Sequence, residues 1–220
     1  MIVAEDVHKY YGNLHVLKGV NASIEKGEIV AIVGKSGAGK TTLLHIIGTL
    51  DVANRGRILY DQTDLTKLSD RQLSAFRNKH IGFIFQFHHL LDEFTALENV
   101  CIPAYIGTSK KKEVESRAKE LLSYLGLADR LTHKPNELSG GEQQRVAIAR
   151  SLINHPSVVL ADEPTGNLDS ATSDDIHHLL FKLRDDFQQT FVIVTHNSEL
   201  ADRCDRTLHM EDGQISNGSL

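Results

Sequence analysis

The sequence predicts an α/β protein with a mostly parallel central sheet. Short apolar runs alternate with helical segments, as expected for parallel strands that are joined by crossover helices. These runs are residues 29–33, 81–85, 158–161 and 191–195. A glycine-rich segment follows the first run, at the strand end where open α/β sheets bind their ligands. The 220 residues, with 40% hydrophobic content, suffice for one domain with a sizeable core.

The chain before the first run has a different character. Val16, Val20 and Ile24 stand among several turn residues, which predicts short antiparallel strands up to about Ile24. The sequence therefore places a small β unit ahead of the parallel sheet.

A helical stretch interrupts the alternation between Phe87 and Ser151. Inside it, one helix is predicted with Ser109 as its N-cap and Gly126 as its C-cap. The apolar stripe of this helix consists of Val114, Ala118, Leu121, Leu122 and Leu125. The basic run Lys110 to Lys112 at its start is interpreted as a solvated face, with an acidic partner as the alternative.

The glycine-rich segment matches G-x-x-x-x-G-K-[ST], a pattern in which backbone N–H groups close around phosphates. Its residues are Gly34, Lys35, Ser36, Gly37, Ala38, Gly39, Lys40 and Thr41. In this pattern Lys40 reaches the β- and γ-phosphates, and the Thr41 hydroxyl meets Mg²⁺. An apolar strand precedes the segment and a helix follows it, so the phosphate meets a helix N-terminus. The glycine spacing excludes the G-x-G-x-x-G dinucleotide fold.

Two adjacent acids, Asp162 and Glu163, end the third apolar run. Neighbouring side chains on a strand point in opposite directions, so the two acids need not share a role. Asp162 is the natural ligand of Mg²⁺, directly or through water, and Glu163 can orient and deprotonate an attacking water. A structural ion pair is the alternative for either acid.

A second glycine segment, Leu138 to Glu142, repeats the anion-binding design. Ser139 caps a glycine turn ahead of a helix predicted over 142–152 and aims a hydroxyl and free N–H groups outward. The segment lacks a lysine, so we expect it to act as a second jaw, that is, a second segment that closes on a nucleotide. It resembles the signature motif of ATP-binding cassette (ABC) proteins. The order of motifs also resembles that family over nearly the whole chain: the phosphate loop, Gln86, the signature, the paired acids, Asn167-Leu168-Asp169 and His196.

The resemblance implies a P-loop NTPase fold of the ABC ATPase type, with an N-terminal antiparallel β subdomain and an inserted helical subdomain. The chain would form one domain over 1–220. Its nucleotide-binding core would span about 1–86 and 152–220, and its helical subdomain about 87–151. Such ATPases work as homodimers, in which two chains clamp two ATP molecules with Mg²⁺.

The resemblance also implies roles for single residues. Gln86 resembles the residue that senses Mg²⁺ and water, and His196 resembles the switch histidine at the γ-phosphate. Tyr11 resembles the aromatic residue that stacks on adenine, with Tyr10 as the other possible register. Asp169 would lie at the dimer seam, with a plain helix cap as the alternative. The other implied ATP contacts are the phosphate loop from Gly34 to Thr41, together with Thr42, Ser139, Gly140, Gly141 and Glu142.

Residues 82–100 resemble the ATP-binding subunits of lipoprotein-releasing complexes. This implies a peripheral motor at the cytoplasmic face of the inner membrane, which drives lipoproteins toward a carrier. Integral membrane subunits would contact it near Phe87 to Phe94, unless these apolar residues only pack the helical subdomain. ATPases of macrolide or peptide efflux and of cell-division complexes share nearly all the motifs and remain alternatives. A soluble DNA-acting ABC ATPase and a small-molecule kinase are further alternatives.

Composition narrows these possibilities. A net charge of −5 and the lack of a long heptad repeat argue against a nucleic-acid partner. No apolar run approaches the roughly 18 residues that span a membrane, and no signal peptide is apparent. Cys101 and Cys204 form no metal or redox pattern and are interpreted as inert thiols. The histidine pairs at 88–89 and 177–178 are adjacent in sequence, so the members of each pair do not face one site.

Overall fold

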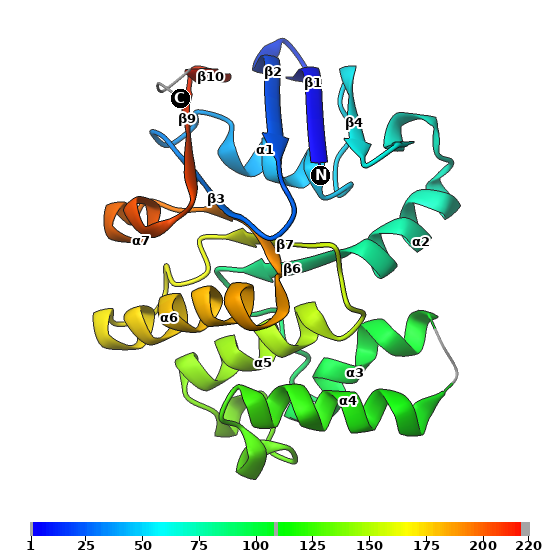
Figure 1. Ribbon diagram of the computed structural model, residues 1–220, viewed down its shortest axis with the longest axis vertical. Helices are drawn as coiled ribbons and strands as arrows, with labels where there is room; N and C mark the ends of the chain where they lie inside the picture. Colours follow the sequence, from blue (N-terminus) through cyan, green and yellow to red (C-terminus); the bar gives the residue numbers. More distant parts are fainter. Residues whose placement is uncertain (1, 108–109, 217–220) are drawn as a thin grey trace.

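The computed structural model describes residues 2–107 and 110–216. Two β-sheets form the upper part of the molecule in Figure 1, and helices α3, α4 and α5 form the lower part. The larger sheet has six strands in the order β10-β9-β3-β8-β7-β6. These strands are β10 (Gln214–Ser216), β9 (Arg206–Glu211), β3 (Ile29–Val33), β8 (Thr190–Val194), β7 (Val158–Asp162) and β6 (Ile81–Phe85). All neighbouring pairs are parallel except β10 with β9.

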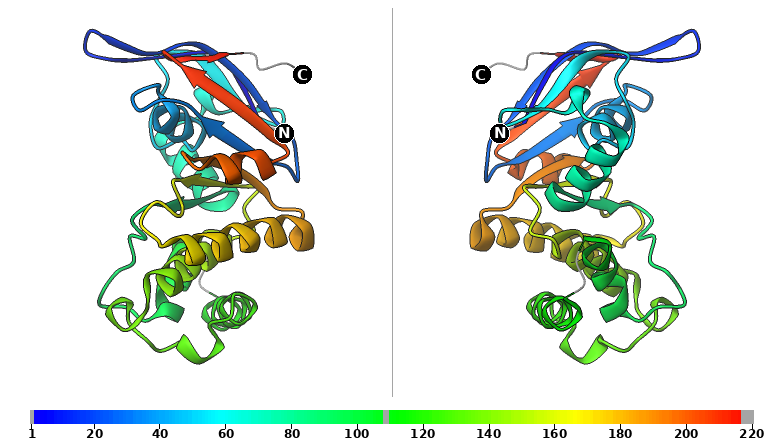
Figure 2. Two further views of the ribbon diagram at one scale, coloured as in Figure 1. Left: turned by 90° about the vertical axis from the view of Figure 1, so that its left-hand side faces the viewer. Right: turned by 90° about the vertical axis from the view of Figure 1, so that its right-hand side faces the viewer.

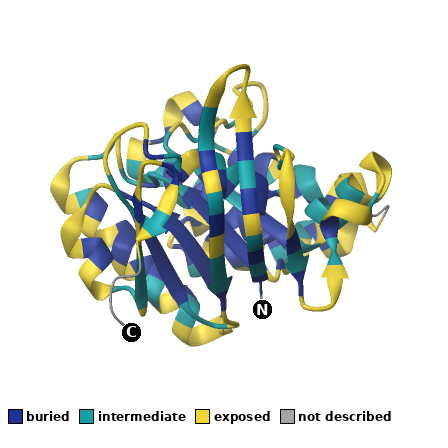
Figure 3. Cartoon of the chain, turned by 90° about the horizontal axis from the view of Figure 1, so that it is seen from above, coloured by how far each residue is buried: buried dark blue, intermediate teal, exposed yellow. Residues whose placement is uncertain are grey.

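The parallel strands are buried on both faces, which explains why they are continuous apolar runs in the sequence. Successive side chains of a strand point to opposite faces and join two separate hydrophobic cores. In β8, Phe191 and Ile193 join the core that contains residues of α5 and α6. Val192 and Val194 join the core between the parallel sheet and the antiparallel sheet. Figure 3 shows these strands as the buried centre of the molecule. The predicted parallel sheet is confirmed, with strand ends that differ from the predicted ones by no more than one residue.

The opening segment forms a four-stranded antiparallel sheet in the order β2-β1-β4-β5. Its strands are β2 (Leu14–Ile24), β1 (Ile2–Tyr11), β4 (Arg55–Tyr60) and β5 (Thr63–Asp64). The prediction of antiparallel strands here is confirmed, but the prediction that they are short is wrong for β1 and β2, which have 10 and 11 residues. Register shifts within the hairpin interrupt the regular alternation, which hides its length from the sequence pattern. The hairpin projects beyond the rest of the molecule in Figure 2.

The helices connect and cover these sheets. They are α1 (Lys40–Ile47), α2 (Asp70–His80), α3 (Ala96–Gly107), α4 (Lys111–Tyr124), α5 (Gly140–Leu152), α6 (Ser170–Phe187) and α7 (Ser198–Arg203), with short 3₁₀ turns η1 (Leu65–Lys67), η2 (Ala128–Arg130) and η3 (Pro135–Glu137). The side chains of α1 join the core shared by the two sheets, whereas those of α5 join the core on the other face of the parallel sheet. Together with the mixed sheet, this arrangement confirms the predicted fold class.

The predicted helix of the inserted segment corresponds to α4. All five residues of its apolar stripe are buried, and Gly126 follows its end with a positive φ of 77°. The predicted cap Ser109 lies outside the described residues. Helix α5 begins at Gly140, two residues before the predicted start, because both glycines of the second motif lie in its first turn. Within the described residues, no helix combines the length and apolar character that crossing a membrane requires.

Candidate active site

The phosphate loop connects β3 to α1, as the sequence predicts. Gly34 and Gly39 have φ values of 155° and 101°, and a side chain at Gly34 would collide with the carbonyl oxygen of Met210. Gly39 occupies the N-cap of α1 without a side-chain cap, so the first N–H groups of the helix face the loop. The Lys40 ammonium donates to the carbonyls of Gly34 and Lys35, at 2.8 and 3.0 Å. Backbone donors, a helix N-terminus and a lysine thus lie together at the end of β3, a combination that suits phosphate groups.

The structure brings Thr41 and Asp162 together from distant parts of the sequence. The Thr41 hydroxyl donates to Oδ1 of Asp162 at 3.2 Å, at the carboxyl end of β7. Burial raises the pKa of the Asp162 carboxyl above its ordinary value, although Thr41, His45 and Lys40 oppose this shift. A carboxylate that burial disfavours, beside a hydroxyl, is a donor set that fits a hard cation such as Mg²⁺. Among the described residues no group of three or more His, Cys, Asp or Glu side chains could hold a metal, so nucleotide oxygens would have to complete such a site.

Glu163 begins the turn after β7 with a positive φ of 47°. This unusual backbone conformation turns its carboxylate toward the end of β8, where Oε1 lies 2.9 Å from Nε2 of His196. The Glu163 N–H donates to the carbonyl of Val194, which fixes the turn against β8. Two predicted catalytic residues, 33 positions apart in the sequence, therefore form a direct pair at the carboxyl edge of the sheet.

Gln86 follows β6 at the same edge of the sheet. Its side-chain amide donates to Oδ1 of Asn167 at 3.0 Å, and the Asn167 amide donates back to the Gln86 carbonyl at 3.2 Å. Asn167 belongs to the loop between Glu163 and α6. This reciprocal pair ties the predicted magnesium-sensing residue to the loop that follows the candidate base.

The two neighbouring tyrosines are in different surroundings, which bears on the open register. The Tyr10 ring stacks on His15 with centroids 4.0 Å apart. The Tyr11 side chain is 49% exposed, and its hydroxyl donates to Asp51, which raises the pKa of the phenol. The same phenol interacts with Thr42 of α1. Tyr11 therefore offers an aromatic ring beside the phosphate-loop helix, with the Lys9 ammonium 4.9 Å from the ring centroid.

The second glycine segment forms a reciprocal cap on α5. The Ser139 hydroxyl accepts from the Glu142 N–H at 3.3 Å, and the Glu142 carboxylate accepts from the Ser139 N–H at 2.8 Å. These bonds, together with Arg130 at 3.0 Å, lower the pKa of Glu142. Gly141 packs against Thr172 of α6 so closely that a side chain there would collide. Asp169, the other predicted seam residue, caps α6 through two bonds to Thr172.

The phosphate loop and the Ser139 segment do not lie together within one chain. Helix α1, which carries the phosphate loop, lies on one face of the parallel sheet, and α5, which carries the Ser139 segment, lies on the other (Figure 1). The residues that do converge at the carboxyl edge are Lys40, Thr41, Gln86, Asp162, Glu163 and His196.

The opposite edge of the sheet carries a cavity of about 860 Å³. Its lining includes Lys26, His155 and Gln188 and none of the predicted site residues. The predicted site residues therefore lie at the carboxyl edge and not at this cavity. The two cysteines agree with the interpretation as inert thiols, because burial raises the pKa of Cys101 and raises that of Cys204 to about 12.

Several contacts of the site are not predicted by the sequence. Asp51 binds both Lys9 and Tyr11, and Asn167 orients Gln86. Arg130 donates to the Glu142 carboxylate. Arg150 donates to the backbone carbonyls of His88 and His89, just after Gln86. These partners come from separate elements, and a single sequence carries no local pattern that pairs them.

Comparison with known proteins gives one consistent result. Residues 17–166 match the model of the ABC transporter family. A lipoprotein-releasing system ATP-binding protein LolD of Bacteroides thetaiotaomicron is 60% identical over 215 residues, which cover 98% of this chain and 99% of that protein. The LolD protein of Cytophaga hutchinsonii is 58% identical, with 98% of each chain covered. The dimeric structure of MJ0796, a bacterial ABC transporter cassette, is similar with a TM-score of 0.89 at 43% sequence identity. The match covers 99% of this chain and 97% of the MJ0796 chain. The same cassette in a dimeric post-hydrolysis state, bound to ADP and Pi, is similar with a TM-score of 0.88 at 41% identity, over 99% of this chain and 97% of that one.

Proposed function

This chain belongs to the ABC transporter family, among its lipoprotein-releasing system ATP-binding proteins, and we propose that it is the ATP-hydrolysing motor of a membrane complex that releases lipoproteins toward a carrier. The observation that carries the proposal is the division of the site. Binding and hydrolytic groups meet at one edge of the sheet, and the second jaw lies on the other face. Such an arrangement uses ATP to bring two chains together.

The chain's own residues divide the work of hydrolysis among them. The phosphate loop and Lys40 bind the phosphates, and Tyr11 supports the adenine from the side of α1. Glu163 accepts a proton from the attacking water, and His196 holds the Glu163 carboxylate in place and reaches toward the γ-phosphate. No covalent intermediate is needed, because positioning and charge stabilisation dominate phosphoryl transfer.

Mg²⁺ is the cation that the donor set fits best. Thr41 and Asp162 would hold it, and Gln86 would approach it from β6. When bound, the ion neutralises charge that develops on the phosphate oxygens. The raised pKa of Asp162 supports this assignment, since a nearby cation would remove the cost of the buried carboxylate.

We assign the second jaw to a second copy of this chain. In the proposed dimer, Ser139, Gly140 and Gly141 of one copy close on the ATP that lies on the phosphate loop of the other. Asp169 lies at the start of α6, next to the helix that carries Ser139, which suits a role at the seam. ATP binding closes this dimer and hydrolysis opens it.

The membrane subunits of the complex bind the segment that follows Gln86. Phe87, Leu91 and Phe94 are 66%, 46% and 40% exposed, whereas Leu90 packs against the helical core. Next to this segment lies a groove of about 400 Å³ between α2 and α3, lined also by Arg150 of α5. Exposed apolar side chains beside a groove suit a helix of a partner protein. This docking places the chain peripherally at the cytoplasmic face of the inner membrane.

Mass spectrometry of the proteins that copurify with a Glu163→Gln variant tests the proposal. The variant is isolated with ATP from gently solubilised native membranes. We expect integral membrane subunits with large extracytoplasmic domains and bound lipoproteins. Subunits of an efflux or cell-division complex would contradict the cargo and preserve the motor, whereas DNA-associated proteins would contradict the membrane role.

A further inference from the structure

The segment from Gln86 to Thr95 is anchored to two different parts of the molecule. At its start, Gln86 is bound to Asn167, which lies in the loop between β7 and α6 of the core. Immediately afterwards, Arg150 of α5 donates from Nη2 to the carbonyl of His88 and from Nη1 to the carbonyl of His89, both at 2.6 Å. Phe87 is therefore the single residue between an anchor in the core and an anchor in the helical region.

The far end of the segment is also tied to the helices. Asn99 of α3, which is completely buried, donates to the carbonyls of Leu91, Phe94 and Thr95 at 3.0–3.1 Å. It also accepts from the Leu91 N–H at 2.8 Å. The hydrogen bonds that hold the apolar residues proposed for partner binding thus come from α3 and α5, whereas their segment contacts the sheet through the packing of the His89 ring on Phe85 of β6, with centroids 5.3 Å apart.

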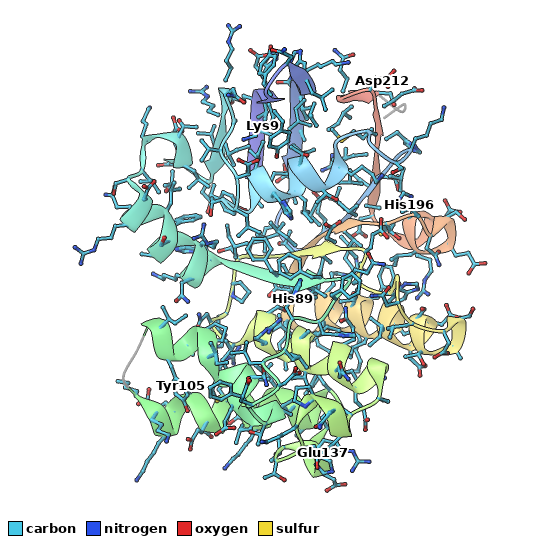
Figure 4. The ribbon with its side chains drawn as sticks, turned by 180° about the vertical axis from the view of Figure 1, so that it is seen from behind. Lys9, His89, Tyr105, Glu137, His196 and Asp212 are labelled. Atoms are coloured by element: carbon cyan, nitrogen blue, oxygen red, sulfur yellow. The ribbon has the colours of Figure 1, made fainter. Side chains whose placement is uncertain are left out.

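The Arg150 contact is strong and geometrically specific. A guanidinium is a planar fork that binds two acceptors at once, and charge-assisted bonds are about twice as strong as neutral ones. Burial lowers the pKa of Arg150, and within residues 2–107 and 110–216 no carboxylate lies at ion-pair distance from it. Its partners are carbonyl groups of one turn, where His89 has a positive φ of 48°. Figure 4 shows labelled His89 at the level where the core meets the helices.

Arg150 lies on the helix whose first turn carries the Ser139 segment. The two residues are 11 positions apart, which corresponds to about 16 Å of helix. Because the continuous helix α5 joins Ser139 to Arg150, we expect a displacement at the Arg150 end to be passed to the Ser139 end.

From this geometry we propose that Arg150 is a positioning residue that transmits partner binding at Phe87 to Phe94 to the ATP-clamping end of α5. The proposal rests on the proposed function, since it needs both a membrane partner and an ATP-bound dimer. Arg150 touches neither the nucleotide nor the reacting atoms. Its role is to make the partner-binding segment and α5 move as one body. Phe87 is then the hinge residue between this body and the core.

Conservative substitution in the reconstituted complex tests this inference. Arg150→Lys keeps the charge and removes the two-pronged bond. Arg145→Lys is the matched control, because Arg145 lies on the same helix and donates to one carbonyl, that of Leu125 at 3.2 Å. Three quantities are measured for each protein: ATPase activity of the isolated chain, retention on membrane subunits in lipid nanodiscs, and the stimulation of ATPase by those subunits.

We expect Arg150→Lys to leave the ATPase activity of the isolated chain within about twofold. With the membrane subunits at saturating concentration, it should lower the stimulation at least about fivefold, the low end of coupling between sites. Arg145→Lys should leave all three near wild type. Full stimulation in Arg150→Lys, or equal loss in both variants, would overturn the role of Arg150. Wild-type protein without ATPase activity, or without retention on the subunits, would instead contradict the proposed function.

Hydrogen exchange of the wild-type chain provides a test that does not depend on a variant folding. Binding of the membrane subunits should change amide exchange in residues 87–94 and in residues 140–143 together. A change restricted to 87–94 would overturn the transmission through α5.

Discussion

The Nε2 of His196 lies 2.9 Å from Oε1 of Glu163, and this pair closes the carboxyl edge of the parallel sheet between β7 and β8. It depends on the positive φ of Glu163, which takes the carboxylate off the path of the strand. Glu163 and His196 each follow a core strand, which places both at the same edge of the sheet. The turn at Glu163 then brings the two side chains together. The pair fixes the orientation of Glu163, the predicted general base, at this edge.

Substitution of Glu163 separates ATP binding from hydrolysis. Glu163→Gln keeps a hydrogen-bonding partner for His196 but cannot accept a proton. We expect the ATPase rate to fall by about 10²–10⁴-fold, the usual contribution of a general base. The affinity for ATP, measured by calorimetry, should change by no more than about threefold. Glu137→Gln, a change in η3 at the lower end of the molecule in Figure 4, is the control and should retain its rate.

Loss of the Asp162 charge should change stability and activity in opposite directions. The native pKa of Asp162 lies above its value in the unfolded chain, since burial disfavours the carboxylate. The folded protein thus binds the proton more readily, and this group contributes stability at low pH that disappears as pH rises through its native pKa. Asp162→Asn should therefore unfold at higher denaturant concentration than wild type at pH 7, with the gap narrowing toward the ordinary carboxyl pKa of about 4. Its Mg²⁺-dependent ATPase should fall at least about 100-fold. A variant less stable than wild type at pH 7 would contradict the assigned burial cost.

The two adjacent tyrosines give a test of adenine stacking. Tyr11→Ala should raise KM for ATP by about fivefold or more, because stacking on a base contributes about 1–3 kcal/mol. Tyr11→Phe keeps the ring and loses only the contacts of the hydroxyl with Asp51 and Thr42, so its KM should remain near wild type. Tyr10→Ala should have little effect, since that ring is stacked on His15. The opposite ranking of Tyr10 and Tyr11 would reverse the register.

Removal of the Ser139 hydroxyl should act on the neighbouring chain's ATP beyond its effect on the helix. Ser139→Ala loses an N-cap and should cost about 1 kcal/mol of stability. Thr95→Ala removes a similar reciprocal cap, made with Glu98 at the start of α3, and should cost about the same. Only Ser139→Ala should abolish ATP-dependent dimerisation. Equal dimerisation of the two variants, measured by light scattering, would contradict the second jaw.

The parts that the sequence predicted well are those with a strong local pattern. The phosphate loop, the acids after β7 and the apolar stripe of α4 each combine residue type with a fixed spacing. The core strands were equally clear, because burial on both faces makes them continuous apolar runs. The position of the phosphate loop and the acids at the carboxyl edge could thus be predicted from the sequence, and the chemical roles assigned to them stay predictions.

The elements that the sequence did not identify lack such a signal for physical reasons. Helix α2 has no buried residue, so hydrophobic periodicity does not mark it. Strand β4 begins with three exposed residues, and only its last two residues pair with the short strand β5. The bonds from Arg150 to two backbone carbonyls and from Asn167 to Gln86 form only when distant elements pack together. Side-chain to backbone contacts of this kind leave no residue-type pattern at the acceptor.

The molecular mass of the Glu163→Gln protein in solution, measured by light scattering with and without Mg²⁺-ATP, tests the central claim most directly. We expect one chain without nucleotide and two chains with ATP, and a return to one chain when Ser139→Ala is added to Glu163→Gln. A protein that binds ATP on its phosphate loop and remains a single chain would contradict a motor built from two jaws on two copies.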